Sequence, residues 1–219
     1  MITPKQSLIF LCLFFLPSLS FAEFQSNDEI AIQLIAASKD YPIQQRIKTQ
    51  SGVLLNTPYL AGALGEGVSG KYDQNPLYRF DYFDCETYVD TVMALVLAKN
   101  LTDFRSKINQ IRYKQANVNF TQRNHFPSAD WIPNNKKNGF IRELTYFIAG
   151  QETKVSRAQI NRRSWYHYLT ADRIQIAYLT PQEKESRLNK LKSEGETLYF
   201  SKKVSIAYIP VFELLRNPK

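Results

Sequence analysis

One helix of this chain can be located from its pattern of apolar residues. After Asp84 and Cys85, apolar side chains recur at steps of three and four, the period of an amphipathic helix with one buried face. Asp84 is a favoured N-cap residue, and Glu86 suits the first turn. The sequence therefore predicts a buried helix that begins at a cysteine and ends near Lys99. Its apolar positions are Tyr88, Val89, Val92, Leu95 and Val96.

The first residues have the pattern of a secretory signal. Lys5 precedes an apolar run from Leu8 to Leu16, and small residues follow as far as Ala22. The run is short for a membrane span, so we expect a cleaved signal peptide over residues 1–22, with an uncleaved anchor as the alternative. Residues 23–219 then form one domain in the periplasm or outside the cell, with no stable membrane insertion after cleavage.

Cleavage leaves a single cysteine, because Cys12 lies inside the apolar run. A disulfide framework needs an even number of cysteines, so Cys85 has another purpose. It is either a small buried hydrophobic residue or a nucleophile. The nucleophile hypothesis draws on the helix start, where unpaired N–H groups favour a thiolate and can stabilise an oxyanion.

The charge balance leaves the type of partner open. The full chain has a formal net charge of +8, and its basic residues are scattered. A cell wall, a membrane surface or a nucleic acid would each match this charge, and so would solubility alone. The absence of an RNA-binding aromatic motif argues against nucleic acid. No HExxH, CxxC or paired histidines indicate a metal, and we expect no cofactor.

The remaining sequence predicts a mixture of helices and extended segments. Helices are predicted near residues 29–41, 42–51, 103–114 and 179–196, and a short apolar helix near the end. Asn27 or Asp28 could cap the first of these, and Thr180 and Pro181 open the helix near 179–196. The helix near 103–114 has an apolar face of Phe104, Ile108 and Ile111. Residues 115–126 alternate like a strand, and residues 76–83 and 197–209 are read as extended. Residues 127–139 predict a turn-rich loop, and residues 140–150 are compatible with either helix or strand.

The sequence contains two histidines. His125 lies in "RNHFPSADW", between Arg123 and Asp130, and Trp131 ends the segment. Together with Trp131, these polar groups could line a substrate pocket, with arginine binding a carboxylate at two points. Alternatively, the segment is a loop held by the tryptophan, with a structural histidine. His167 lies among aromatic residues and is interpreted as a packed residue.

Two motifs resemble one family. "TPYLAGALGEG…YRFDYFDCETYVDTVMAL" and "RNHFPSADWIPNN" are similar to the N-acetylmuramoyl-L-alanine amidase-like family, within the NlpC-type papain-like cysteine peptidases. The resemblance implies an α+β fold, with the nucleophile-bearing helix packed on an antiparallel sheet. It also implies exported enzymes that cut between N-acetylmuramic acid and L-alanine in peptidoglycan fragments. Cys85 matches the nucleophile, and Tyr59 matches the tyrosine beside it, which we expect to bind substrate. Asp84 matches the aspartate of the family's Asp-Cys motif, and we interpret it as a helix cap.

The chain departs from this family pattern at its end. The family's catalytic histidine lies in a His-Val-Gly-like strand after a Gly-Asp turn, and this chain stops soon after "SIAYIP". We therefore expect a domain truncated at its C-terminus, with that histidine beyond residue 219 and His125 as the candidate base within the chain. Two functions follow: a cysteine amidase acting on muropeptides, or an inactive muropeptide-binding protein on the same scaffold.

Overall fold

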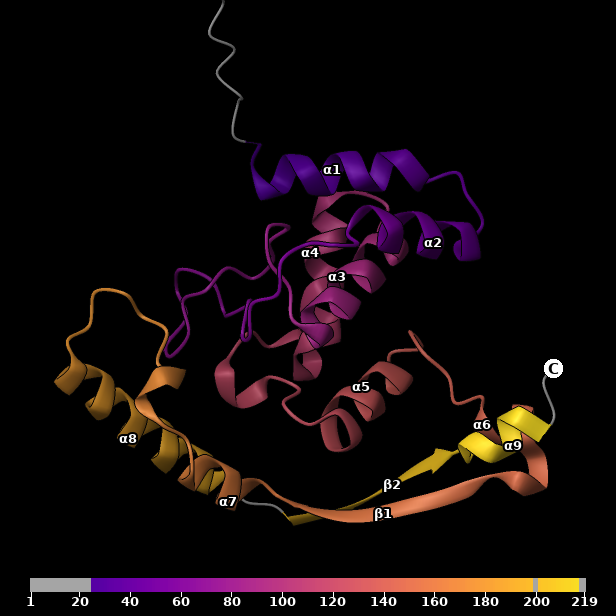
Figure 1. Cartoon of the computed structure of the whole chain (residues 1–219). Coiled ribbons are helices and arrows are strands. Elements are labelled where there is room, and N and C mark those ends of the chain that lie inside the picture. Colours follow the sequence, from indigo (N-terminus) through magenta and orange to yellow (C-terminus); the bar gives the residue numbers. More distant parts are fainter. Residues whose placement is uncertain (1–24, 199–200, 217–219) are drawn as a thin grey trace, which may run out of the picture.

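The computed structural model describes residues 25–198 and 201–216. Its first half is a group of helices around the predicted cysteine helix, which is α3 (Figure 1). The main partners of α3 are the other three helices of this group. The predicted signal peptide lies outside the described residues. The four helices are α1 (Asn27–Ser38), α2 (Ile43–Val53), α3 (Cys85–Leu97) and α4 (Leu101–Arg112).

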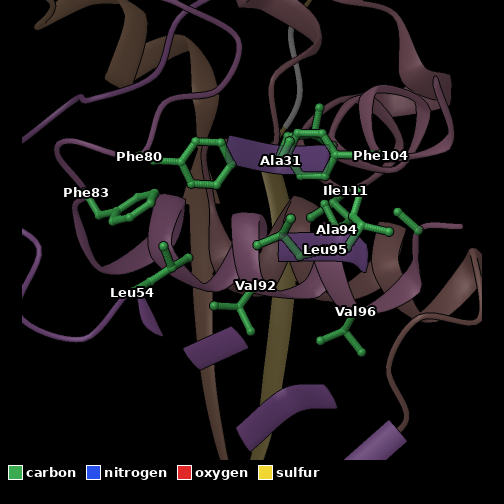
Figure 2. Close-up of a cluster of buried hydrophobic side chains, with 13 residues drawn as sticks. Ala31, Leu54, Phe80, Phe83, Val92, Ala94, Leu95, Val96, Phe104 and Ile111 are labelled. Atoms are coloured by element: carbon green, nitrogen blue, oxygen red, sulfur yellow. The ribbon is translucent and has the colours of Figure 1, made fainter. Parts of the chain in front are cut away.

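Helix α3 begins where its sequence predicts. The Asp84 carboxylate accepts a hydrogen bond from Thr87 N at 2.8 Å, and Asp84 N donates to Thr87 Oγ1 at 2.9 Å. This reciprocal cap satisfies two backbone donors of the first turn. Val89, in contrast to the other apolar positions, is 43% exposed. The apolar face joins a core built mainly from α1, α3 and α4, with Leu54 directly after α2 (Figure 2). Its members include Ala31, Ile35, Val92, Leu95, Val96, Phe104, Ile108 and Ile111.

The helices on either side of α3 are also confirmed, with one change at a cap. Helix α1 is capped by Ser26 instead of Asn27 or Asp28, because Ser26 Oγ accepts from Glu29 N at 3.3 Å. Glu29 in turn accepts from Ser26 N at 2.7 Å. In α4, the predicted apolar face is buried, and Asn100 caps its start by accepting from Asp103 N.

The predicted strand at residues 115–126 is wrong. The segment forms two short 3-10 helices, η1 (Lys114–Ala116) and η2 (Phe120–Gln122). Its polar side chains bond to backbone groups: Asn119 Oδ1 accepts from Thr121 N at 3.0 Å, and Asn124 Nδ2 donates to Ile111 O at 2.8 Å. The alternation therefore reflected asparagines that stabilise turns instead of one face of a sheet.

The predicted loop at residues 127–139 is helical. It contains a π-helix, η3 (Pro127–Trp131), followed directly by α5 (Ile132–Lys137). The asparagines of α5 and its end donate to the last carbonyls of α4. Asn134 and Asn138 bond to Gln110 O at 2.9 and 3.1 Å, and Asn135 bonds to Ile111 O at 3.2 Å. Turn-forming residues serve here to attach one helix to the unpaired end of another.

A second, smaller core lies around α7 (Arg162–His167), η5 (Ala171–Arg173) and α8 (Pro181–Thr197). Helix α8 starts as expected, with Thr180 as its cap and Pro181 at its first position. Tyr72 joins this core from residues 61–77, a loop before α3 that contains Gly62, Gly65, Gly67 and Gly70 and is called the glycine-rich loop below. The buried members are Tyr72, Phe120, Tyr166, Leu169, Ile174, Ile176, Leu188 and Leu191.

Gly195 of α8 gives a stability prediction. A Cβ added there would lie 2.1 Å from the buried Tyr166 ring, so Gly195→Ala must displace that ring. We expect the free energy of unfolding to fall by about 1–3 kcal/mol in urea denaturation. Gly52 of α2 is the control, since a Cβ there meets nothing within 4 Å. Gly52→Ala is expected to be neutral or to stabilise by up to about 1 kcal/mol. Equal effects at both sites would contradict the packing argument.

The second half of the chain contains a two-stranded antiparallel ribbon of β1 (Lys154–Asn161) and β2 (Ser201–Tyr208). Lys154 pairs with Tyr208 and Asn161 with Ser201. The α+β class is thus confirmed. The ribbon contacts η3 and α6, whereas α3 packs mainly on helices. No helix in the described ranges is long and apolar enough to cross a membrane. The remaining elements are α6 (Thr145–Ala149), η4 (Gly150–Glu152) and α9 (Val211–Arg216).

Candidate active site around Cys85

Cys85 is the first residue of α3, and its side chain is exposed. The capping carboxylate of Asp84 has a second contact, since its Oδ2 accepts from Gly62 N at 3.1 Å. Asp84 therefore joins the glycine-rich loop to the start of the helix, directly beside the thiol. An exposed thiol next to the N–H groups of a helix start can attack a carbonyl and hold the resulting oxyanion.

Tyr59 lies on the segment that runs beside the start of α3. It forms an isolated parallel bridge with Phe83, in which Leu60 N donates to Phe83 O at 2.9 Å and Phe83 N donates to Pro58 O at 3.1 Å. The Tyr59 side chain is 72% exposed. The structure thus brings the backbone of Tyr59 to the approach of Cys85, with the phenol open to solvent.

Behind the thiol, α3 carries a buried carboxylate. Asp90 Oδ1 accepts from Trp131 Nε1 at 2.8 Å, while Oδ2 has no hydrogen bond and lies 3.9 Å from Arg112 Nε. Burial raises the pKa of Asp90 to about 7, against the positive charge of Arg112. Trp131, predicted as a substrate-binding residue, therefore ties η3 to α3, and its ring packs on the main core.

Asp90 gives the fold a pH dependence. Its folded pKa lies above the ordinary aspartate value of 3.8, so between about pH 4 and pH 7 the folded state holds a proton that the unfolded state has lost. Stability contributed by Asp90 is complete below pH 4 and is lost as the pH rises through 7. Through Asp90, we expect the free energy of unfolding of the wild type to fall by about 2–4 kcal/mol between pH 4 and pH 8. We expect Asp90→Asn not to show this fall, and urea unfolding measures it.

Comparing the wild type with Asp90→Asn separates the effect of Asp90 on stability from the effects of other titrating groups. Burial also raises the pKa of Glu66 and Glu86, and these groups act in the same direction in both proteins. His125 acts in the opposite direction, again in both. Parallel pH profiles for wild type and Asp90→Asn would contradict the assignment.

Arg112 shapes the loop in front of α3. It is 4% exposed, and its guanidinium donates to the carbonyls of Leu64, Gly65 and Leu77 at 3.1–3.2 Å. A buried cation at the end of α4 thus holds both ends of the glycine-rich loop. Because Asp84 fixes the same loop at Gly62, the surroundings of Cys85 are attached at two places.

Arg123, predicted to bind substrate, is engaged elsewhere. Its guanidinium bonds to Glu66 and, at 2.9 Å, to Asp73 Oδ2. Both carboxylates belong to the glycine-rich loop and are buried. The closest of these contacts is a charge-assisted hydrogen bond between Arg123 Nη2 and Glu66 Oε1. The arginine therefore closes a buried ion-pair cluster that pins the loop to the segment after α4.

His125 is held in a neutral form. Its Nε2 lies 2.7 Å from Phe120 O, and because a carbonyl only accepts, this nitrogen carries the proton. The ring packs against both Phe120 and Trp165, with centroids 4.7 and 4.6 Å away. Burial, aided by the charge of Arg123, lowers the pKa of His125 well below 6.5. His167 is exposed at the end of α7 and packs on Tyr168.

Asp130 forms a buried ion pair with a residue that the sequence analysis did not single out. Both of its carboxylate oxygens lie 2.5 Å from Arg162 Nη2, and the two side chains are 2% and 3% exposed. Phe126 N also donates to Asp130 Oδ2, at 3.3 Å. Arg123, His125 and Asp130 thus have separate partners and do not form one network.

Sequence reasoning missed the charged residues that organise the site. Asp90 and Arg112 each lie on a buried helix face, and Arg112 is four residues after Ile108. A charge at an apolar position of a helical pattern was the available signal. Glu66 and Asp73 lie in a loop without periodicity, so no sequence signal indicated their role. Within residues 25–198 and 201–216, no three His, Cys, Asp or Glu side chains are grouped to hold a metal ion.

The chain was compared with known proteins. Residues 49–217 match the sequence model of a family described as AmiA-like, N-acetylmuramoyl-L-alanine amidase-like. A solved protein from Legionella pneumophila is 34% identical with a TM-score of 0.82, over 85% of this chain and 64% of that one. An N-acetylmuramoyl-L-alanine amidase from Bacteroides uniformis is 24% identical with a TM-score of 0.50, over 74% of this chain and 63% of that one.

These similarities support different conclusions. At 24% identity, the Bacteroides structure supports the fold alone. No curated protein matches the chain. The chain spans slightly less than two thirds of the length of either solved protein.

Proposed function

Because the chain belongs to the N-acetylmuramoyl-L-alanine amidase-like family, we propose that it hydrolyses the bond between N-acetylmuramic acid and L-alanine in peptidoglycan fragments, with Cys85 as the nucleophile. The observation that carries this proposal is the exposed Cys85 thiol at the capped start of α3. A buried cysteine would have favoured a packing role. The chain is exported in this proposal, which agrees with the signal pattern of residues 1–22.

The reaction proceeds through a thioester. The Cys85 thiolate forms an S–C bond to the lactyl carbonyl of the muramic acid, and N–H groups at the start of α3 stabilise the oxyanion. The C–N bond to alanine then breaks, and the leaving amine takes a proton. Water attacks the thioester, which releases the sugar acid and restores the thiol. Within the described residues, His125 is the candidate for moving these protons, through its unprotonated Nδ1.

The test is hydrolysis of a purified muropeptide by residues 23–219. We expect two products in the mass spectrum: a peptide with a free N-terminal alanine and the sugar acid, which together have gained one water. An intact sacculus tested in parallel shows whether fragments are preferred. If neither substrate is cut, the amidase proposal fails, whether or not either one binds. N-terminal sequencing of the exported protein is expected to begin at Glu23.

One observation favours the second candidate, a muropeptide-binding protein without turnover. His125 Nε2 is occupied by Phe120 O, and the pKa of this histidine lies far below the value suited to a base at neutral pH. This candidate predicts binding of the muropeptide with no products. Calorimetry on the same sample distinguishes it from the amidase.

A further inference from the structure

A cavity of about 470 Å³ lies beside η3 and α5, and three lysines line it. Lys114 comes from η1, Lys137 from the end of α5, and Lys202 from the start of β2. Three segments that are distant in the sequence thus direct basic side chains to one hollow. Its volume is typical of sites that bind small molecules. None of its lining residues belongs to the loop or the helix start that hold Cys85.

The charge of this cavity is one-sided. Asp130 is the one acidic residue among its described lining residues, and Arg162 binds both of its carboxylate oxygens. The acid is therefore compensated from within the protein and does not neutralise the lysines. Lys114 and Lys137 are exposed and form no ion pair with any described residue. Their ammonium groups are left to an anion from outside.

Parts of the cavity wall are held in place before any ligand arrives. Lys202 Nζ donates to Ala129 O at 3.0 Å, which attaches β2 to η3 and orients this lysine. Gln115 and Ala116 have φ angles of 52° and 57°, a left-handed conformation that side-chain-bearing residues rarely adopt. Two successive residues of this kind turn the chain so that Lys114 and Gln115 face the cavity. Strained backbone of this type concentrates at functional sites.

We propose that this lysine pocket, defined by Lys114, Lys137 and Lys202, binds a carboxylate of the peptide part of the substrate. The identity of the peptide rests on the proposed function. A peptidoglycan fragment carries a peptide with a C-terminal carboxylate, the group that lysine ammonium ions bind by charge and hydrogen bonding. The amides of Gln115 and Gln122 line the same cavity and offer donors and acceptors to the peptide backbone.

The experiment measures binding of an acetylated tripeptide with a free carboxylate to Cys85→Ala protein, by calorimetry in low salt. We expect Lys114→Gln/Lys137→Gln to weaken binding about ten-fold or more. The matched control is Lys136→Gln/Lys190→Gln, which removes the same charge from exposed lysines outside the pocket. It is expected to leave the affinity within about two-fold. The tripeptide amide, which lacks the carboxylate, is expected not to bind.

Three outcomes would overturn the proposal: equal weakening by the pocket and control variants, equal binding of the amide, or binding of inorganic phosphate without binding of the tripeptide. The last result would assign the pocket to another anion. The assay needs no turnover, so its outcome is separate from that of the proposed function. If the wild type is active and the pocket variant binds the tripeptide as tightly as the wild type does, only the pocket proposal is contradicted. If the wild type is inactive but binds the tripeptide through the pocket lysines, only the proposed amidase activity is contradicted.

Discussion

Cys85→Ala is expected to abolish hydrolysis of the muropeptide, with kcat lower by at least about 10⁴-fold. The alanine side chain cannot form the thioester, so the two-step route through the enzyme is lost. Because Cys85 is exposed and forms no hydrogen bond in the described structure, its loss leaves no cavity and no unpaired polar group. Product formation, followed by mass spectrometry over several hours, measures the effect.

One further variant and one further measurement make this result specific. Val89→Ala changes an exposed residue one turn along the same helix and is expected to keep kcat within about two-fold. The melting temperature of Cys85→Ala is expected to match the wild type, which separates lost chemistry from lost folding. Wild-type kcat in Cys85→Ala would remove Cys85 from the mechanism.

Asp130→Asn is expected to destabilise the protein by about 3–5 kcal/mol, the largest stability effect that we predict. The substitution keeps the shape of the side chain but removes the negative charge that lies 2.5 Å from the buried Arg162 guanidinium. Loss of one charge of a buried ion pair leaves the opposite charge less well compensated in a low-dielectric interior. Urea unfolding at pH 7, with the midpoint and slope both fitted, measures the change.

The control for this variant is an ion pair at the surface. Asp81 pairs with Arg79 at 2.5 Å but is 58% exposed, so Asp81→Asn is expected to cost less than about 1 kcal/mol. A double variant, Asp130→Leu/Arg162→Met, removes both buried charges and is expected to recover more than half of the lost stability. If Asp130→Asn is no worse than Asp81→Asn, burial of the pair does not govern its energy.

The secondary structure was predictable where the signals were local. The helix at Cys85, the apolar face of α4 and the start of α8 all follow from caps and periodicity within one or two turns. Residues 115–139 were predicted wrongly because their asparagines make long-range bonds. Asn134 and Asn135 bind carbonyls of α4 more than twenty residues away. A turn-forming residue gives the same local pattern whether it makes a turn or attaches a helix.

The candidate site was predictable in part for the same reason. Cys85 and its Asp84 cap are neighbours in sequence, and the structure places them as the pattern indicates. The segment with Arg123, His125 and Asp130 was predicted to line a substrate pocket as a polar network. Its members nevertheless turn to different partners, and two of them build buried ion pairs.

The sequence by itself determined that this protein has an amphipathic helix starting at Cys85 and two motifs of an amidase-like family. Only the tertiary structure decided that Arg123 pairs with Glu66 and Asp73, and that three separate lysines meet in one pocket. The physical reason is the range of the interactions. A cap joins groups three residues apart, whereas Arg123 and Glu66 are 57 residues apart and meet through packing of the whole chain.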